Sequence, residues 1–235
     1  MNFQDGNTTD CFPSKETMLT ESVETYLITI FLLTETAPRA KTGKIASRLG
    51  VHLSSVSEML RRLEKTGYVI HETHRGTALT EYGQQIALNL IRKQRLLETF
   101  LFQMAKYALS EVHEEAQKMR HVISDRLADS LDAMLGYPQT DPHGHPIPSA
   151  DGAMVSLDLL SLSDAAAGET AVIRRLDDRD SAKLQYLSEL GLLPDMQVEV
   201  VEIAPFQGPV TVKINNETVV IANELAQKIG VEVGK

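Results

Sequence analysis

Residues 42–67 read TGKIASRLGVHLSSVSEMLRRLEKTG, and this stretch predicts two short helices joined by a tight turn. Apolar residues recur at helical spacing on one side of each helix, and Gly50 stands where a glycine commonly follows a helix. We expect Thr42 to cap the first helix and Ser54 or Ser55 to cap the second, because hydroxyl side chains accept the N–H groups that a helix start leaves unpaired. The stretch therefore predicts a helix-turn-helix.

The flanking segments extend this motif into a small domain. Apolar residues at i, i+3, i+4 and i+7 predict a helix over Glu21–Thr34, which Pro38 ends. After the motif, residues 68–80 contain two β-branched runs separated by a polar stretch with Gly76 at its tip, which is typical of a hairpin. Beside a helix-turn-helix such a hairpin is a wing that reaches the DNA backbone or minor groove. The alternative is a hairpin that only closes the domain.

The charge distribution favours DNA as a partner, although the formal net charge of -9 taken alone argues against it. Residues 36–80 carry eight basic and three acidic side chains, a local charge of +5, which leaves -14 on the other 190 residues. A basic segment on an acidic body is typical of a small DNA-binding module attached to a scaffold that does not bind DNA.

The composition is that of an ordinary globular chain, since 43% of its 235 residues are hydrophobic and 23% are charged. Cys11 is the only cysteine, which excludes an intrachain disulfide framework and a zinc site of the CxxC type. The longest apolar stretch near the start, residues 26–33, is far shorter than the roughly 20 residues of a membrane helix. Residues 1–20 lack the pattern of a signal peptide. We therefore expect a cytoplasmic protein with no membrane contact and a mobile tail over 1–19.

The remaining sequence predicts two further regions. Apolar spacing indicates a long helix from Thr80 and a second helix over 110–135, followed by a proline-rich loop over 137–148. These helices carry more apolar surface than a winged helix needs, so we expect a homodimer that buries it. Beyond residue 168 the period changes to two, and about five short strands predict a small barrel.

The order of these elements resembles the DtxR/MntR family of metal-dependent transcriptional repressors, and the barrel resembles the FeoA-like module. Short strings carry the likeness: VHLSSVS at 51–57, RG at 75–76, VHEEA at 112–116, HVISD at 121–125, PHGHPIP at 142–148, LSELGLLP at 187–194 and PFQGPV at 205–210. The resemblance runs from about residue 20 to the end of the chain.

This resemblance implies an α+β fold with a defined order of domains. The winged helix-turn-helix would occupy 20–82, a helical dimerisation and metal-sensing domain 83–150, a linker 151–167, and an SH3-like β-barrel of the FeoA type 168–235. It further implies a repressor of metal-homeostasis genes that binds a palindromic operator in double-stranded DNA as a homodimer. A divalent ion would tie the first helix to the dimer helices and so set the spacing of the two recognition helices.

The resemblance also implies an ancillary-type metal site. The ligands of that site fall on Gln94, Glu98 and His113, of which the last two are usual ligand types. Glu98 stands one helical turn after Gln94, which is the spacing that two ligands of one ion need. Asp141 occupies a loop position where some relatives place a ligating cysteine, and it offers an oxygen instead.

The primary-type site departs from the family pattern. Its ligands fall on Thr25, Gln117, Arg120 and His121, and only His121 is a usual ligand. Arg120 cannot coordinate a cation, and its charge would repel one by about 4 kcal/mol per unit charge at 4 Å and an effective dielectric of 20, doubled for a divalent ion. His113, Gln117 and His121 nevertheless lie on one face of the predicted helix, at i, i+4 and i+8. His121 alone would equally fit a hydrogen-bonded core histidine.

Two explanations of this departure stay open. In the first, a single rearranged site uses Glu98 and His113 together with Gln94, Gln117 or Asp141. Its nitrogen and oxygen ligands suit Mn(II) or Fe(II). In the second, Arg120 pairs with a carboxylate and substitutes for the missing cation. The protein would then bind DNA independently of metal or in response to another signal.

The predicted DNA contacts lie on the helix-turn-helix and the wing. Hydroxyl and basic side chains there would mostly hold phosphates, so DNA shape and contacts with thymine methyl groups contribute to specificity. The expected contact residues are Thr42, Lys44, Ser54, Ser55, Ser57, Arg61, Arg62 and Arg75.

Other classes of function fit less well. His113-Glu114 begins like the HExxH helix of a zinc protease, but Gln117 stands where the second histidine belongs, and the chain has no GxSxG or phosphate-binding glycine loop, so we predict no enzyme. An interaction protein that docks peptides on its barrel is opposed by the basic segment. A regulator that answers to a small organic ligand or to redox state would have only Cys11, which can cross-link two subunits but cannot form an intramolecular switch.

Overall fold

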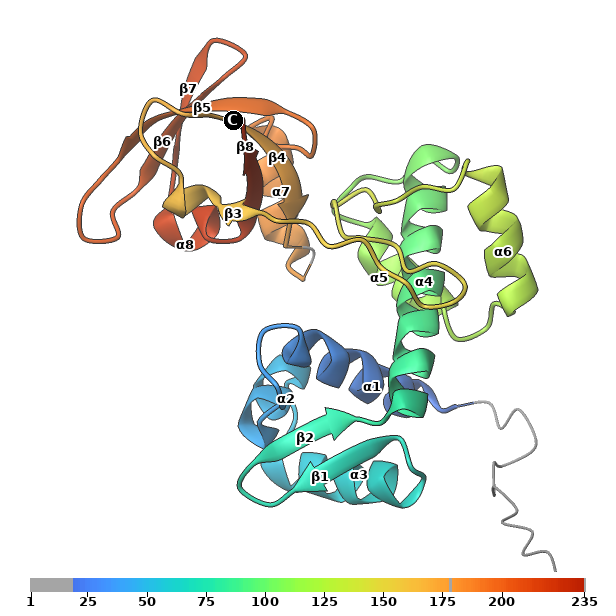
Figure 1. Cartoon of the computed structure of the whole chain (residues 1–235). Helices are drawn as coiled ribbons and strands as arrows, with labels where there is room; N and C mark the ends of the chain where they lie inside the picture. The colour runs from blue at the N-terminus through green and yellow to red at the C-terminus, as the bar shows by residue number, and fades with distance from the viewer. Residues whose placement is uncertain (1–18, 178, 235) are drawn as a thin grey trace, which may run out of the picture.

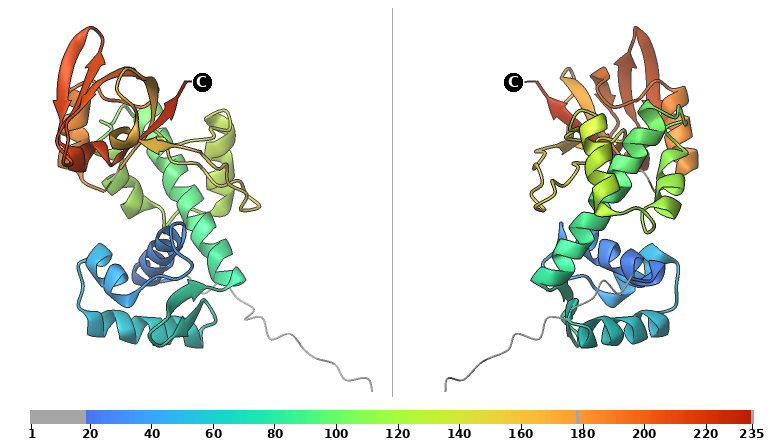
Figure 2. Two further views of the ribbon diagram at one scale, coloured as in Figure 1. Left: turned by 60° about the vertical axis from the view of Figure 1, so that its left-hand side comes forward. Right: turned by 90° about the vertical axis from the view of Figure 1, so that its right-hand side faces the viewer.

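The computed structural model describes residues 19–177 and 179–234, so residues 1–18 of the predicted tail, with Cys11, lie outside the described residues. Figure 1 shows three bodies, which follow the chain from blue through green to red. A long helix, drawn in green, runs from the first body into the second. Both views of Figure 2 show this helix connecting the two bodies. The α+β fold class predicted from the sequence is confirmed.

The first body is a winged helix. It consists of α1 (Glu21–Thr34), α2 (Thr42–Leu49), α3 (Leu53–Lys65) and the antiparallel hairpin of β1 (Val69–Glu72) and β2 (Gly76–Leu79). Leu27, Ile45 and Leu60 are fully buried between the three helices. Gly76 has a φ of 110°, and a Cβ there would lie 2.8 Å from the Ala40 carbonyl oxygen, so the wing closes on the segment before α2 only with glycine.

The predicted helix caps in this body are wrong. Lys41 is the N-cap of α2 and His52 is the N-cap of α3, and neither side chain makes a capping bond. The reason is that the backbone carbonyls of these two residues already accept the first helical hydrogen bonds, from Ile45 and Val56. The hydroxyls expected to cap, those of Thr42, Ser54 and Ser55, therefore belong to the first turns of the helices.

The second body is helical and contains α4 (Glu81–Gln103), α5 (Val112–Met119) and α6 (Asp125–Met134). The single helix expected over 110–135 is wrong, because the chain turns after Met119 and restarts at Ser124, whose hydroxyl accepts a hydrogen bond from Leu127 N–H at 3.2 Å. Leu96, Leu97 and Val112 lie at the centre of a separate apolar cluster. Among the helices of the described residues, none combines the length and the apolar character that crossing a membrane requires.

The third body is a curved six-stranded antiparallel sheet of order β3-β8-β4-β5-β6-β7 with two helices (Figure 1). Leu160 pairs with Val231, and Leu162 is fully buried in the core of this body. The barrel therefore begins about eight residues before the predicted boundary at 168, and part of the predicted linker belongs to it. Its elements are β3 (Leu160–Ser161), a 3₁₀ turn (Leu162–Asp164), β4 (Thr170–Leu176), α7 (Ser181–Glu189), β5 (Gln197–Ile203), β6 (Val210–Ile214), β7 (Glu217–Ile221), α8 (Asn223–Ala226) and β8 (Ile229–Val233).

Candidate metal centre and DNA-binding surface

The predicted recognition helix α3 and the wing form the end of the molecule opposite the barrel (Figure 1). Most of the side chains predicted to contact DNA are available there: Lys44, Ser54, Ser55, Arg61, Arg62 and Arg75 are exposed, whereas Thr42 and Ser57 are half-buried. Ser57 donates its hydroxyl to the carbonyl of Leu53 at 2.9 Å, so part of its capacity is used within α3. The predicted contact residues thus all belong to the winged helix, and most of them are exposed.

One basic residue near this surface escaped the sequence analysis. Lys41 extends its ammonium group to the carbonyl oxygens of His74 and Arg75, at 3.4 and 3.1 Å. Arg39 forms an ion pair with Glu72, and Arg75 lies 3.2 Å from the same carboxylate. These contacts fix the wing against the start of α2. The only sequence signal was their place in the basic segment.

The candidate metal centre begins on α4, where Gln94 and Glu98 lie one turn apart and face His113 of α5. Gln94 Nε2 donates to Glu98 Oε1 at 2.9 Å, and His113 Nδ1 lies 3.0 Å from the same oxygen. Glu98 is fully buried and His113 is half-buried. The three residues predicted from the ancillary-type pattern therefore meet in one place.

The loop after α6 brings a second group of ligand types to Glu98. The ligand atoms of Asp141, His143 and His145 all lie within 4.8 Å of one another. Asp141 Oδ1 accepts the backbone N–H groups of His143 and His145, both at 2.9 Å. Its other oxygen, Oδ2, is buried and accepts no hydrogen bond from any described residue, and Arg95 Nε and His145 Nδ1 approach it only to 3.7 and 3.6 Å.

His143 connects the loop to the helical site. Its Nε2 lies 2.9 Å from the carbonyl oxygen of Leu109, and as the donor of this bond it leaves the acceptor lone pair of the neutral ring on Nδ1. That Nδ1 lies 3.8 Å from Glu98 Oε2. A histidine that donates one ring nitrogen to a carbonyl and presents the other to acidic oxygens has the arrangement of a metal ligand.

The donor set fits a divalent cation. Glu98 and Asp141 are both buried carboxylates, and Asp141 Oδ2 accepts no hydrogen bond from a described residue, which is costly unless positive charge compensates it. Imidazole nitrogens and carboxylate oxygens without a thiolate suit Mn(II) or Fe(II) better than softer ions. His143 and His145 were not predicted as ligands, although the spacing Asp141-x-His143-x-His145 is a signal that could have indicated them.

The residues of the predicted primary-type site come together only in part: Thr25, Gln117 and Arg120 line one cleft, and His121 does not take its expected place. α5 ends at Met119, so His121 lies in the following turn and does not share a helix face with His113 and Gln117. The physical reason is that the helix ends after Met119 and a new helix, α6, begins at the Ser124 cap. Gln117 lines a cleft of about 890 Å³ with Glu98 and His113. His121 Nδ1 is buried and has no hydrogen-bond partner among the described residues.

Arg120 occupies the centre of this predicted site as a buried cation. Its Nη1 donates to Gln94 Oε1 at 2.5 Å, its Nη2 donates to Thr25 Oγ1 at 3.0 Å, and its Nε lies 3.8 Å from Glu24 Oε2. Burial raises the pKa of Glu24, and the nearby Arg120 opposes that shift. Burial likewise lowers the pKa of Arg120, against the effect of Glu24, and the guanidinium stays charged at neutral pH. The expected pairing of Arg120 with a carboxylate is thus present.

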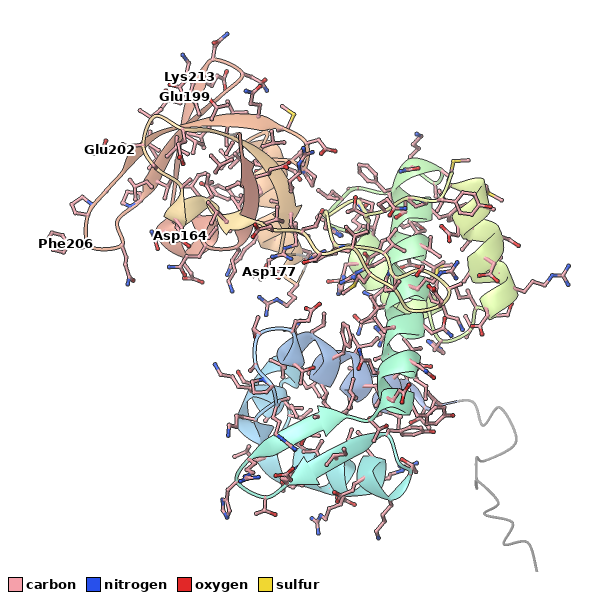
Figure 3. The ribbon with its side chains drawn as sticks, in the orientation of Figure 1. Asp164, Asp177, Glu199, Glu202, Phe206 and Lys213 are labelled. Carbon is pink, nitrogen blue, oxygen red and sulfur yellow. The ribbon has the colours of Figure 1, made fainter. Side chains whose placement is uncertain are left out.

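The barrel packs directly on the loop over residues 137–148, which carries Asp141, His143 and His145 and is called the metal loop below. Leu176 N–H of β4 donates to the carbonyl of His143 at 2.8 Å. A Cβ on Gly144 would lie 1.7 Å from the carbonyl oxygen of Arg174, so the loop approaches the strand as closely as backbone allows. Asp177, at the end of β4, lines the same cleft as Glu98, and Figure 3 shows it on the side of the barrel that faces the helical body.

Comparisons with known proteins cover nearly the whole described chain. Three family models match: "Iron dependent repressor, N-terminal DNA binding domain" over 18–77, "Iron dependent repressor, metal binding and dimerisation domain" over 80–149, and "FeoA domain" over 160–233.

Individual relatives match along their full length. The iron-dependent repressor IdeR of Mycobacterium tuberculosis is 31% identical over 91% of this chain and 98% of its own length. The diphtheria toxin repressor of Corynebacterium diphtheriae is 30% identical with the same coverage. A solved structure described as a manganese-dependent transcriptional repressor in complex with manganese superimposes with a TM-score of 0.84 at 36% identity, over 90% of this chain and 100% of that one.

Proposed function

The chain belongs to the iron-dependent repressor family, and from this membership we propose that it is a metal-responsive transcriptional repressor that binds operator DNA as a homodimer. Relatives named for iron and a neighbour named for manganese support Fe(II) or Mn(II) as the ion. Because these proteins are metal-dependent, the alternative of DNA binding without metal is not favoured. The family consists of transcriptional repressors, and we propose no enzymatic activity and a cytoplasmic location.

The metal centre carries this proposal. Glu98 Oε1 lies 3.0 Å from His113 Nδ1, and Glu98 Oε2 lies 3.8 Å from His143 Nδ1. We assign Glu98, Asp141 and His143 as the core ligands, with His113, His145 and Gln94 beside them. A bound divalent ion would supply the positive charge that these buried acidic oxygens need. We assign no ligand role to Gln117 or His121.

The winged helix is the part of the chain that would contact the operator DNA. We propose that the exposed hydroxyl and basic groups of α3 contact the major groove, while Arg75 on the wing contacts phosphates. Two copies are required for a palindromic operator, and the helical body exposes apolar side chains that a second copy would cover, including Val122, Leu127 and Met134. The proposed domains are 20–82, 83–150 and a barrel that begins near residue 160.

DNA binding with controlled metal tests the proposal. The chelator-treated protein is mixed with random duplexes in the presence of Mn(II), bound sequences are selected, and the affinity for a selected duplex is measured by fluorescence anisotropy with Mn(II), Fe(II) or Zn(II) at fixed salt. We expect a large gain in affinity on adding Mn(II) or Fe(II), lost in Glu98→Ala and His143→Ala and kept in Glu115→Ala, which changes a carboxylate on the surface of α5. Failure to select any sequence, or equal affinity with and without metal, would overturn it.

A further inference from the structure

A continuous chain of polar contacts joins the candidate metal centre to the DNA-binding domain. It begins at Glu98, passes through Gln94 and Arg120, and ends at Thr25 and Glu24 on α1. Three steps are hydrogen bonds: 2.9 Å from Gln94 to Glu98, 2.5 Å from Arg120 to Gln94, and 3.0 Å from Arg120 to Thr25. The last step, from Arg120 Nε to Glu24 Oε2, is a longer ion-pair contact of 3.8 Å. All five side chains are buried or half-buried, so water competes little for these bonds.

Arg120 is the link between the two bodies. It follows α5 of the helical body, yet two of its three partners belong to α1 of the winged helix. The partners are 95 and 96 residues away in sequence, so they meet only when the two bodies are packed as they are here. The donors of the guanidinium lie in one rigid plane. When one partner moves and the group turns with it, the hydrogen-bond geometry to the other partners changes as well.

Gln94 is the link between Arg120 and the metal centre. Its amide oxygen accepts the bond from Arg120, and its amide nitrogen donates to Glu98 Oε1 and lies 3.2 Å from His113 Nδ1. The amide nitrogen therefore stands against Glu98 Oε1 and His113 Nδ1, two atoms of ligand type. An amide ligates a cation only through its oxygen, and that oxygen is engaged by Arg120. Gln94 cannot serve the metal centre and keep its present bond to Arg120 unchanged.

We propose that Gln94 and Arg120 form a relay that couples occupancy of the metal centre to the position of the winged helix. The inference rests on the proposed function, which supplies the cation. In the structure, the Gln94 amide is shared between Glu98 and Arg120. When Glu98 and His113 turn to a cation, the amide reorients and Arg120 changes its hold on Thr25 and Glu24. The two states differ in the contacts at both ends, which is what coupling between sites requires.

Arg92 provides a matched control, because it is an equally buried arginine of the same helical body. Its exposure is 4% against 3% for Arg120, but its ion-pair partners, Asp129 and Asp132, both lie on α6. Replacing Arg92 therefore removes a buried cation and its two ion pairs with α6, and neither pair crosses the boundary between the two bodies. A general loss of stability would affect both variants, whereas a loss of coupling would affect only Arg120.

The test measures coupling separately from binding. Mn(II) affinity is determined by calorimetry for the free protein and for the protein bound to the selected duplex, and the ratio of the two affinities is the coupling factor. Exchange of the α1 amides with deuterium, with and without Mn(II), provides a readout that needs no DNA. The variants are Gln94→Leu, Arg120→Met and Arg92→Met, with Thr25→Val as a mild variant in case the buried substitutions do not fold.

We expect Arg120→Met to bind Mn(II) and Gln94→Leu to bind it more weakly both with and without DNA. Both variants should lower the coupling factor, which is the ratio of the two affinities, by about tenfold, within the usual range for linked sites. Thr25→Val should lower it in the same direction by a smaller factor, and Arg92→Met should leave it unchanged. In the wild type, Mn(II) should change the exchange of α1, and in Gln94→Leu it should not. A full coupling factor in Gln94→Leu or Thr25→Val overturns the relay. A wild type whose DNA affinity ignores Mn(II) instead overturns the proposed function.

Discussion

The imidazole of His143 is completely buried, and its Nε2 lies 2.9 Å from the carbonyl oxygen of Leu109. This bond orients the ring so that its second nitrogen, Nδ1, faces Glu98 Oε2 at 3.8 Å. A loop residue and a helix residue that are 45 positions apart in sequence thereby become neighbours at one site. Because the bond to Leu109 comes from the protein itself, it holds the ring in place and reduces the entropy cost of assembling the centre.

Loss of the His143 ring should weaken metal binding strongly. His143→Ala removes a nitrogen ligand and leaves the Leu109 carbonyl without its donor, so we expect Mn(II) affinity to fall by more than about tenfold, the lower limit for residues that only support a ligand. Calorimetric titration of the chelator-treated protein measures this. His71→Ala, a histidine of the wing, serves as the control, and a His143→Ala affinity equal to the control would remove this residue from the centre.

Gly144 should be required for packing of the barrel on the metal loop. In Gly144→Ala the new Cβ would fall 1.7 Å from the Arg174 carbonyl oxygen, so we expect a loss of about 1–3 kcal/mol in the free energy of unfolding, as for other overpacked sites. Denaturant unfolding measures the loss, and faster proteolysis of residues 149–159 would report release of the barrel. Gly136→Ala is the matched control, because Gly136 also has a positive φ but meets nothing within 4 Å. Equal losses in both variants would show that the close contact is not important.

Arg75 should contribute one phosphate contact. Its side chain is 79% exposed at the wing, so Arg75→Ala should fold normally, weaken DNA binding on all sequences and reduce the slope of log K against log salt by about 1. Anisotropy at several salt concentrations measures the slope. Arg126→Ala, an exposed arginine at the start of α6, should leave it unchanged. A slope for Arg75→Ala equal to that of the wild type would place the wing outside the interface.

Asp125 should stabilise the start of α6 in a pH-dependent way. Hydrogen bonds from Lys93 and Asn89 lower the pKa of Asp125. A lowered pKa in the folded state means that the stabilisation is present above the pKa of the unfolded chain and is lost as the pH falls through the folded value. Because the side chain is 69% exposed, the effect should be only a few tenths of a kcal/mol. Asp125→Asn should lower the unfolding free energy at pH 7 and leave it unchanged at pH 2; an equal change at both would contradict this.

The winged helix could be predicted from the sequence because its signals are local. The apolar spacing in Glu21–Thr34, the glycines at 50 and 67, and the β-branched runs around Gly76 are local signals, and the structure confirms the helices and the hairpin that they predict. The helix caps were harder to place, because whether Lys41 or Thr42 begins α2 depends on a single backbone hydrogen bond. The break before α6 was missed because the apolar spacing of α5 and α6 is nearly continuous across it.

The sequence by itself determined the types of the elements, their order and the concentration of positive charge at one end, because helix periodicity, strand alternation and charge counts are properties of neighbouring residues. Only the tertiary structure decided which polar side chains share a site. Glu98 meets His143 because the loop folds back on α4, and Arg120 meets Glu24 because two bodies pack together. Such contacts between distant segments follow from how apolar faces are buried, so no local pattern around either partner predicts them.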